Sequence, residues 1–211
     1  MNNRKAGYLV LMLVLGVVMV PGAGAQDGVR MLPARDANFS YNWVQGGFES
    51  GRVENPRGSI DSVFVEGARG LDEHLFLLGG LTLFDGKVRH GPGSDRPEFD
   101  GYRLQGGLGF NTRLDRGLDL VLSGQVARVY ADFDEGGSDA KHGVLMRGGV
   151  RYQASQELEL SGGAFFESID RSEIGLYGEG LYRITDPLDL GVRIAVGDDV
   201  GTVGLVLRYG F

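Results

Sequence analysis

Charged side chains that alternate with apolar ones are the residues of this sequence with the clearest chemical potential. They are Arg103, Arg147, Arg151, Glu159, Glu167, Glu179, Arg183, Arg193 and Arg208. Arginine binds carboxylates through parallel hydrogen bonds, so these residues could form an ion-pair network that fills and stiffens the interior of a protein. The same residues could instead line a charged path for small ions or solutes.

Two histidines offer a different kind of chemistry. His90 and His142 lie in polar segments near Asp95, Glu98 and Asp139. A histidine and a carboxylate that face each other across two loops could give a surface hydrolase. Solvated histidines without a catalytic role are the simpler interpretation, and the sequence predicts no catalytic residue.

An acidic segment could hold a metal ion. Asp132, Asp134, Glu135 and Asp139 are close in sequence, and oxygen ligands at alternate positions could bind Ca²⁺. Their spacing does not complete a known calcium loop, so a solvated loop tip is the favoured interpretation. We therefore expect neither a metal site nor a cofactor.

The segments that must position these residues repeat with a period of two. Leu190, Val192 and Ile194, for example, alternate with Gly191 and Arg193. Such alternation places one set of side chains on each face of a β-strand. Ten strands are predicted, near residues 39–50, 58–69, 74–85, 99–113, 117–131, 142–153, 157–168, 174–185, 188–197 and 202–211. Eight strands is the alternative count, because Leu75 to Leu78 is apolar on both faces.

The connections between these strands are of two kinds. Very short ones lie at residues 70–73, 115–117, 155–156 and 186–187. Longer or more varied ones lie at residues 51–57, 85–98, 132–141, 170–172 and 197–201. Short periplasmic turns and longer extracellular loops are typical of outer-membrane β-barrels.

The fold class that follows is all-β, a closed antiparallel transmembrane β-barrel. Lipid offers no hydrogen-bonding partner, so a sheet that spans a membrane cannot leave an open edge. The charged positions should then face the lumen, since a charge facing hydrocarbon is unfavourable. A soluble β-sandwich would also alternate, but it does not explain the two kinds of connection.

Aromatic residues suggest where the membrane interfaces lie. Phe110, Tyr152 and Tyr182 fall near the short connections, and Tyr41 and Trp43 open the first strand on the same side. We expect these residues to form a periplasmic aromatic girdle. Packing in the interior is the alternative for Trp43.

Both ends of the sequence carry targeting features. A basic start and the uncharged apolar run from Tyr8 to Val20 predict a signal peptide over residues 1–25, cut between Ala25 and Gln26. A membrane anchor is the alternative. A periplasmic tail (26–37) and the barrel (38–211) would follow. The last strand resembles the signal read by the barrel assembly machinery, with an apolar alternate set of Val203, Leu205, Leu207, Tyr209 and Phe211.

Composition narrows the range of partners. The net charge of −7 does not favour binding to nucleic acid, which requires Lys and Arg to neutralise phosphates. The chain has no cysteine and therefore no disulfide framework. We expect outer-membrane lipid and the assembly machinery as partners, and a monomer, because barrel closure leaves no edge to pair.

Several short motifs together suggest a family. They are residues 41–48 (YNWVQGGF), 99–104 (FDGYRL), 148–152 (GGVRY) and the Gly-Asp-Asp at 197–199. In this order they resemble a proteobacterial family of ten-stranded outer-membrane barrels that includes the diffusible-signal-factor-regulated outer-membrane and vesicle proteins. The resemblance implies an outer-membrane location and no enzymatic activity. The expected function is a non-enzymatic envelope protein, with a narrow channel and a surface hydrolase as alternatives.

Overall fold

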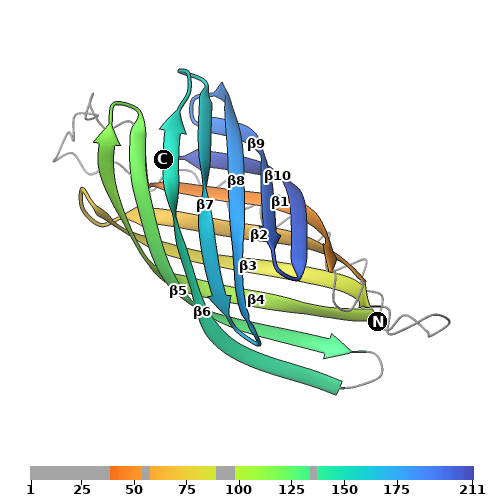
Figure 1. Cartoon of the computed structure of the whole chain (residues 1–211). Helices are drawn as coiled ribbons and strands as arrows, with labels where there is room; N and C mark the ends of the chain where they lie inside the picture. Colours follow the sequence, from red (N-terminus) through yellow and green to blue (C-terminus); the bar gives the residue numbers. More distant parts are fainter. Residues whose placement is uncertain (1–38, 54–57, 89–97, 134–136) are drawn as a thin grey trace, which may run out of the picture.

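Ten antiparallel strands close on themselves in the computed structural model (Figure 1). The structure describes residues 39–53, 58–88, 98–133 and 137–211. The predicted signal peptide (1–25), its cleavage site between Ala25 and Gln26, and the tail (26–37) lie outside these residues. Within the described part of the chain, no helix is long and apolar enough to cross a membrane.

Each strand pairs with its neighbours in sequence, and the last strand pairs with the first. The strands are β1 (Trp43–Val53), β2 (Gly58–Gly70), β3 (Leu75–Val88), β4 (Glu98–Asp115), β5 (Leu118–Phe133), β6 (Gly137–Gln153), β7 (Leu158–Ser168), β8 (Ser172–Thr185), β9 (Leu188–Gly197) and β10 (Val200–Gly210). The prediction of ten strands is thus confirmed, and the alternative of eight is excluded. We call the end with the connections 71–74, 116–117, 154–157 and 186–187 the short-turn end, and the opposite end the loop end.

The largest error in the predicted strands concerns residues 132–141. These residues were expected to form a loop, but β5 continues to Phe133 and β6 already begins at Gly137. Pairing persists to the hairpin tip, where Phe133 lies opposite Gly137. A hairpin that is solvated on both faces needs no apolar residues, so its polar sequence resembles a loop. Gly137 has a φ of 78°, a conformation that glycine adopts without strain.

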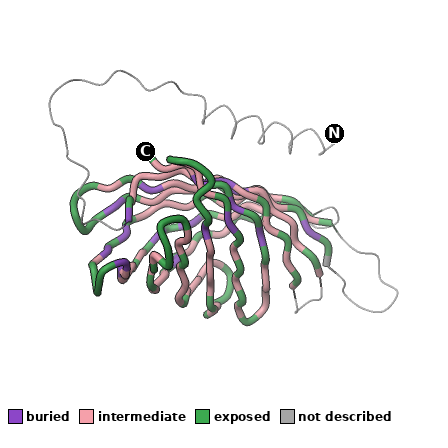
Figure 2. The backbone as a smooth tube through the Cα atoms, turned by 90° about the horizontal axis from the view of Figure 1, so that it is seen from above, coloured by how far each residue is buried: buried purple, intermediate pink, exposed green. Residues whose placement is uncertain are grey.

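The barrel is apolar outside and polar inside. Along the strands, exposed and less exposed residues alternate (Figure 2). Val126, Leu176 and Leu205 of the outer face are 69%, 67% and 61% exposed. In contrast, Gln45 and Arg208 of the inner face are buried. The ambiguous start of β3 is resolved in the same way, because Phe76 is buried in the lumen and its neighbours Leu75 and Leu77 are exposed.

The connection between β2 and β3 shows how one side chain fixes a short turn. Oδ1 of Asp72 accepts hydrogen bonds of 2.7 Å from the backbone amides of His74 and Leu75. These bonds favour the ionised carboxylate and lower the pKa of Asp72 below its usual value. These two hydrogen bonds hold the conformation of this exposed turn.

Glycines on the inner face make room for large aromatic side chains. A Cβ atom on Gly109 would lie 2.1 Å from the ring of Phe76, and one on Gly47 would lie 2.8 Å from that of Phe64. Likewise, a Cβ on Gly149 would lie 2.6 Å from the hydroxyl of Tyr177. Rings that cover glycines of adjacent strands let a narrow barrel hold both aromatic and charged groups.

Candidate functional site in the barrel lumen

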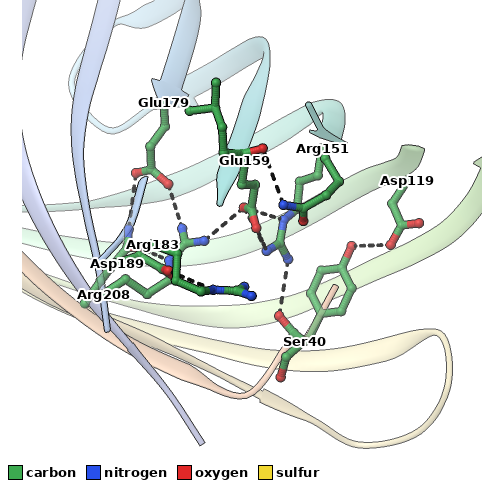
Figure 3. Close-up of polar contacts among 12 residues, drawn as sticks. Ser40, Asp119, Arg151, Glu159, Glu179, Arg183, Asp189 and Arg208 are labelled. Atoms are coloured by element: carbon green, nitrogen blue, oxygen red, sulfur yellow. Dashed lines mark hydrogen bonds and ion pairs between the residues drawn. The ribbon is translucent and has the colours of Figure 1, made fainter. Parts of the chain in front are cut away.

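Arg208 on β10 is the centre of a polar cluster near the short-turn end (Figure 3). Its Nε donates to Oε1 of Gln45 at 2.6 Å. Its two terminal nitrogens donate to Glu159 at 3.0 Å and to Glu179 at 2.6 Å. All of its guanidinium nitrogens therefore have acceptors, although Arg208 is only 7% exposed.

Arg151 on β6 extends this cluster toward the short-turn end. Its Nε and Nη2 donate to Glu159 at distances from 2.8 to 3.0 Å, and its Nη1 donates to the backbone carbonyl of Ser40 at 3.3 Å. The rings of Phe39 and Tyr41 lie 4.6 and 4.8 Å from its guanidinium carbon. The hydroxyl of Tyr41 donates to Asp119 at 3.1 Å (Figure 3). The segment before β1 is thus fixed across the mouth of the barrel.

Arg193 on β9 extends the cluster in the other direction. Its Nε donates to Glu179 at 2.9 Å, and its terminal nitrogens form ion pairs with Glu66 and, at 3.5 Å, with Glu49. Gln45 donates to Glu66 at 2.6 Å. A continuous chain of ion pairs therefore connects Arg151 to Glu49 through Glu159, Arg208, Glu179 and Arg193, and joins β6 to β10 with β1 and β2. We call this the lumen network.

Aromatic rings support the guanidinium groups of the lumen network. Arg208 lies 4.7 Å from the centre of the Trp43 ring, and Arg193 lies 4.7 Å from that of Phe64. Ring contact and full pairing compensate the loss of hydration that a buried arginine suffers. Such a network holds the barrel wall rigidly from inside, because a charge that moves loses several partners together.

Three predicted lumen arginines lie outside this network. Arg103 pairs with Glu167 at 2.9 Å. Arg183 is half-exposed at the short-turn end and lies 3.6 and 3.5 Å from Asp186 and Asp189. Arg147 pairs with no carboxylate among the described residues, and its guanidinium carbon lies 5.6 Å from the Tyr177 ring.

Two cavities lie along the barrel axis. The larger has a volume of about 490 Å³ and extends from Trp43 to Thr202, at the loop end. The smaller, of about 210 Å³, lies at the short-turn end beside Phe39 and Pro187. Trp43, Arg151 and Arg208 line both cavities. These three side chains therefore form the partition between the two cavities.

The expectation that Tyr41 and Trp43 belong to the periplasmic aromatic girdle is wrong, and the alternative for Trp43, packing in the interior, is correct. Trp43 lines the lumen, and Tyr41 stacks on the inward-facing Phe76 with ring centres 4.6 Å apart. The guanidinium groups of the network attract these electron-rich rings inward. Phe110, Tyr152 and Tyr182, in contrast, are exposed on the outer face as expected.

The sequence did not identify the partners that β1 and β2 contribute to the network. Gln45 and Glu49 stand at alternate positions with Trp43, and Glu66 follows Phe64 by two residues. This spacing of two was the signal that could have placed them in the lumen. Placing Trp43 in the girdle on the outer face puts Gln45 and Glu49, which share its face, on the outside as well.

The loop candidates are not brought together in the described part of the chain. His142 is exposed on β6, whereas His90 lies outside the described residues. Asp134 and Glu135 are also outside them. Asp132 and Asp139 lie on opposite faces of the β5–β6 hairpin, since Asp132 pairs with Ser138 and Ala131 with Asp139. No group of three His, Cys, Asp or Glu residues in the described ranges could hold a metal ion.

Asp139 has a different partner. The ammonium group of Lys141 lies 3.4 Å from Asp139 and 2.5 Å from Asp170 in the β7–β8 connection. The hydrogen bond from Lys141 lowers the pKa of the Asp170 carboxyl. Asp139 thus takes part in a link between two hairpins at the loop end.

The final strand presents its alternate residues to the outside. Val203, Leu205 and Leu207 are 54%, 61% and 44% exposed, and Phe211 is 59% exposed. The backbone amide of Phe211 donates to the carbonyl of Asn42 at 3.1 Å. The last residue is therefore held beside the segment that precedes β1.

Comparison with known proteins identifies the fold. No protein-family model and no curated protein matches the chain. The translocator domain of the autotransporter NalP from Neisseria meningitidis is 12% identical, with a TM-score of 0.51 over 81% of this chain and 87% of that one. The chain has the fold of an outer-membrane β-barrel.

Two other solved structures are also similar to this chain. The NanC porin is 9% identical with a TM-score of 0.49, over 81% of this chain and all of that one. Neisserial surface protein A is 15% identical with a TM-score of 0.45, over 82% and 98% of the two chains. Identities this low concern the fold alone, so function has to be inferred from the lumen and the surface of this barrel.

Proposed function

We propose that this chain is a non-enzymatic integral outer-membrane protein whose lumen is sealed by arginine and glutamate side chains. The lumen network carries this proposal, since it crosses the barrel with each of its guanidinium groups paired. A sealed barrel has its loops and its outer surface available for function. We infer that it serves envelope integrity or contacts made by the extracellular loops.

The outer surface supports the membrane location. Its exposed leucine, valine and isoleucine side chains would be unfavourable in water over so large an area, whereas hydrocarbon accommodates them. Residues 1–25 as a signal peptide and the C-terminal set ending at Phe211 as the assembly signal belong to the same proposal. So do a monomeric state and membership of the family that contains the diffusible-signal-factor-regulated proteins.

A narrow channel is the second candidate, and the larger cavity favours it. The partition of Trp43, Arg151 and Arg208 lies between this cavity and the smaller one. If the partition opened in the membrane, the two cavities would form a continuous path through the barrel.

Cell fractionation with a gel-mobility test examines the location. The account predicts that the protein sediments with outer membranes, and that unboiled samples migrate differently from boiled ones because the closed barrel resists detergent. Recovery in the soluble periplasmic fraction, with identical mobility before and after boiling, would contradict an outer-membrane barrel.

A further inference from the structure

Among the described arginines that line the larger cavity, one lacks the ion pair that the others have. Arg147 lines the larger cavity, yet no carboxylate oxygen of the described residues lies within 4.0 Å of its guanidinium nitrogens. Its Nε is buried without a hydrogen-bond acceptor, and the same holds for Nε of Arg103. A buried cation without a partner is unfavourable, so a site that retains one is suited to an anion from outside.

The surroundings of Arg147 provide further polar groups. Tyr177 lies against its guanidinium, and Gln105 and Gln125 line the same cavity. Gly149 on β6, opposite Gly163 on β7, leaves the space that the hydroxyl of Tyr177 occupies. Glu49, Glu66 and Glu179 also line this cavity, and all three form ion pairs with Arg193. A carboxylate at Arg147 would therefore meet a cation and neutral donors beside glutamates that are already paired. Glu173 is four residues before Tyr177 on β8, about 13 Å away along the strand.

The wall toward the loop end has a different chemistry. There the apolar side chains of Ile60, Phe84, Val129 and Val200 line the cavity together with Glu49, Glu167 and Glu173, and Phe165 stands directly opposite Arg147 on the neighbouring strand. Its volume of about 490 Å³ falls in the range of small-molecule pockets, roughly 300–1,000 Å³. A ligand with a charged end and a compact apolar body would match both parts of this cavity.

We propose that the larger cavity binds a small organic monocarboxylate, with its carboxylate on Arg147 and its apolar body among the side chains toward the loop end. The ligand enters from the loop end, because the partition closes the other side. Arg103, whose Nε has no acceptor, provides a second donor. This goes beyond the sealed barrel, since a pocket that is closed at one end binds a ligand without conducting.

Calorimetry with benzoate tests this site in the folded protein in nonionic detergent, with benzyl alcohol as the neutral probe of the same shape. Benzoate should bind saturably, and benzyl alcohol should not. Arg147→Met should weaken benzoate binding about 10- to 100-fold, as expected for the loss of a bidentate charge-assisted contact. Arg147→Lys should lose less, because it keeps the charge.

Arg113→Met is the matched control, since Arg113 is exposed at the short-turn end of β4 and does not line the cavity. It should bind benzoate as the parent protein does. Gel mobility before and after boiling verifies that each variant is folded. Absence of saturable benzoate binding to the folded parent protein, or equal affinities for the parent and Arg147→Met, would overturn the proposal. Neither result would affect the proposed sealed barrel, which is tested by conductance.

Discussion

The two ends of the lumen differ in how completely their buried arginines are paired with carboxylates. Toward the short-turn end, Arg151, Arg208 and Glu159 pair with each other and leave only a small cavity. Toward the loop end, the cavity is larger, and Arg147 has an aromatic neighbour but no ion pair with a carboxylate of the described residues. Full pairing makes the first region a stable seal, whereas incomplete pairing in the second leaves room and charge for a ligand.

The largest expected effect is the loss of stability when a carboxylate is removed from the paired region. Glu179→Gln removes the carboxylate shared by Arg193 and Arg208, which leaves two buried guanidinium groups undercompensated. We expect a loss of about 3–5 kcal/mol in the free energy of unfolding. Urea unfolding followed by the fluorescence of Trp43, the single tryptophan, measures it. Glu157→Gln in an exposed turn is the control, and equal losses in both variants would remove the distinction.

Substitution of Arg147 should change the free energy of unfolding in the opposite direction, toward higher stability. Arg147→Met removes a buried charge that has no ion pair among the described residues and whose Nε lacks a hydrogen-bond acceptor. The free energy of unfolding should therefore rise by about 1–3 kcal/mol, the cost of an unsatisfied buried polar group. The same urea titration, without added carboxylate, gives the value. A loss of stability as large as that of Glu179→Gln would show that Arg147 belongs to the sealed region.

A smaller effect should come from the segment that crosses the short-turn mouth. Tyr41→Phe deletes the hydrogen bond to Asp119 and keeps the ring beside Arg151 and Phe76. We expect a loss of about 1 kcal/mol. Tyr152→Phe on the exposed outer face provides the comparison, and an equal effect at both sites would mean that the bond to Asp119 contributes nothing.

The smallest expected effect is a pH-dependent contribution to stability from Asp72 in the turn between β2 and β3. The pKa of Asp72 is lowered in the folded protein, so its contribution to stability is present above its usual pKa and disappears as the pH falls through the lowered value. Asp72→Ala should therefore destabilise the protein more at pH 7 than at about pH 2. Urea titrations of both proteins at the two pH values measure this, and a difference that does not change with pH would contradict the role of the carboxylate.

Alternation in the sequence was sufficient for the number of strands and for the face of most charged residues. A period of two assigns a side chain such as Arg193 to one face without any knowledge of its neighbours. It fails where both faces have the same character, as at Leu75 to Leu78 in the barrel wall and at residues 132–141 in the solvated hairpin. At Leu75 to Leu78, packing inside the lumen decides which side chains face inward. In the hairpin, strand pairing continues beyond the membrane-spanning part of the barrel wall.

The contacts of the candidate site could not be predicted in the same way. The hydrogen bond from Arg208 to Gln45 joins residues 163 positions apart, and it exists only because β10 closes against β1. Trp43 has the character of an interface residue, but the guanidinium of Arg208 attracts it inward. Which arginine lacks a carboxylate likewise depends on the register around the whole barrel.

Single-channel conductance in a planar bilayer, with the parent protein and Arg208→Ala side by side, tests the seal most directly. Arg208→Ala removes one of the two arginines of the partition between the two cavities. The account predicts no current steps from the folded parent protein and steady steps from the variant. Steady current through the parent protein, with no change on substitution of Arg208, would contradict a sealed barrel and identify a narrow channel.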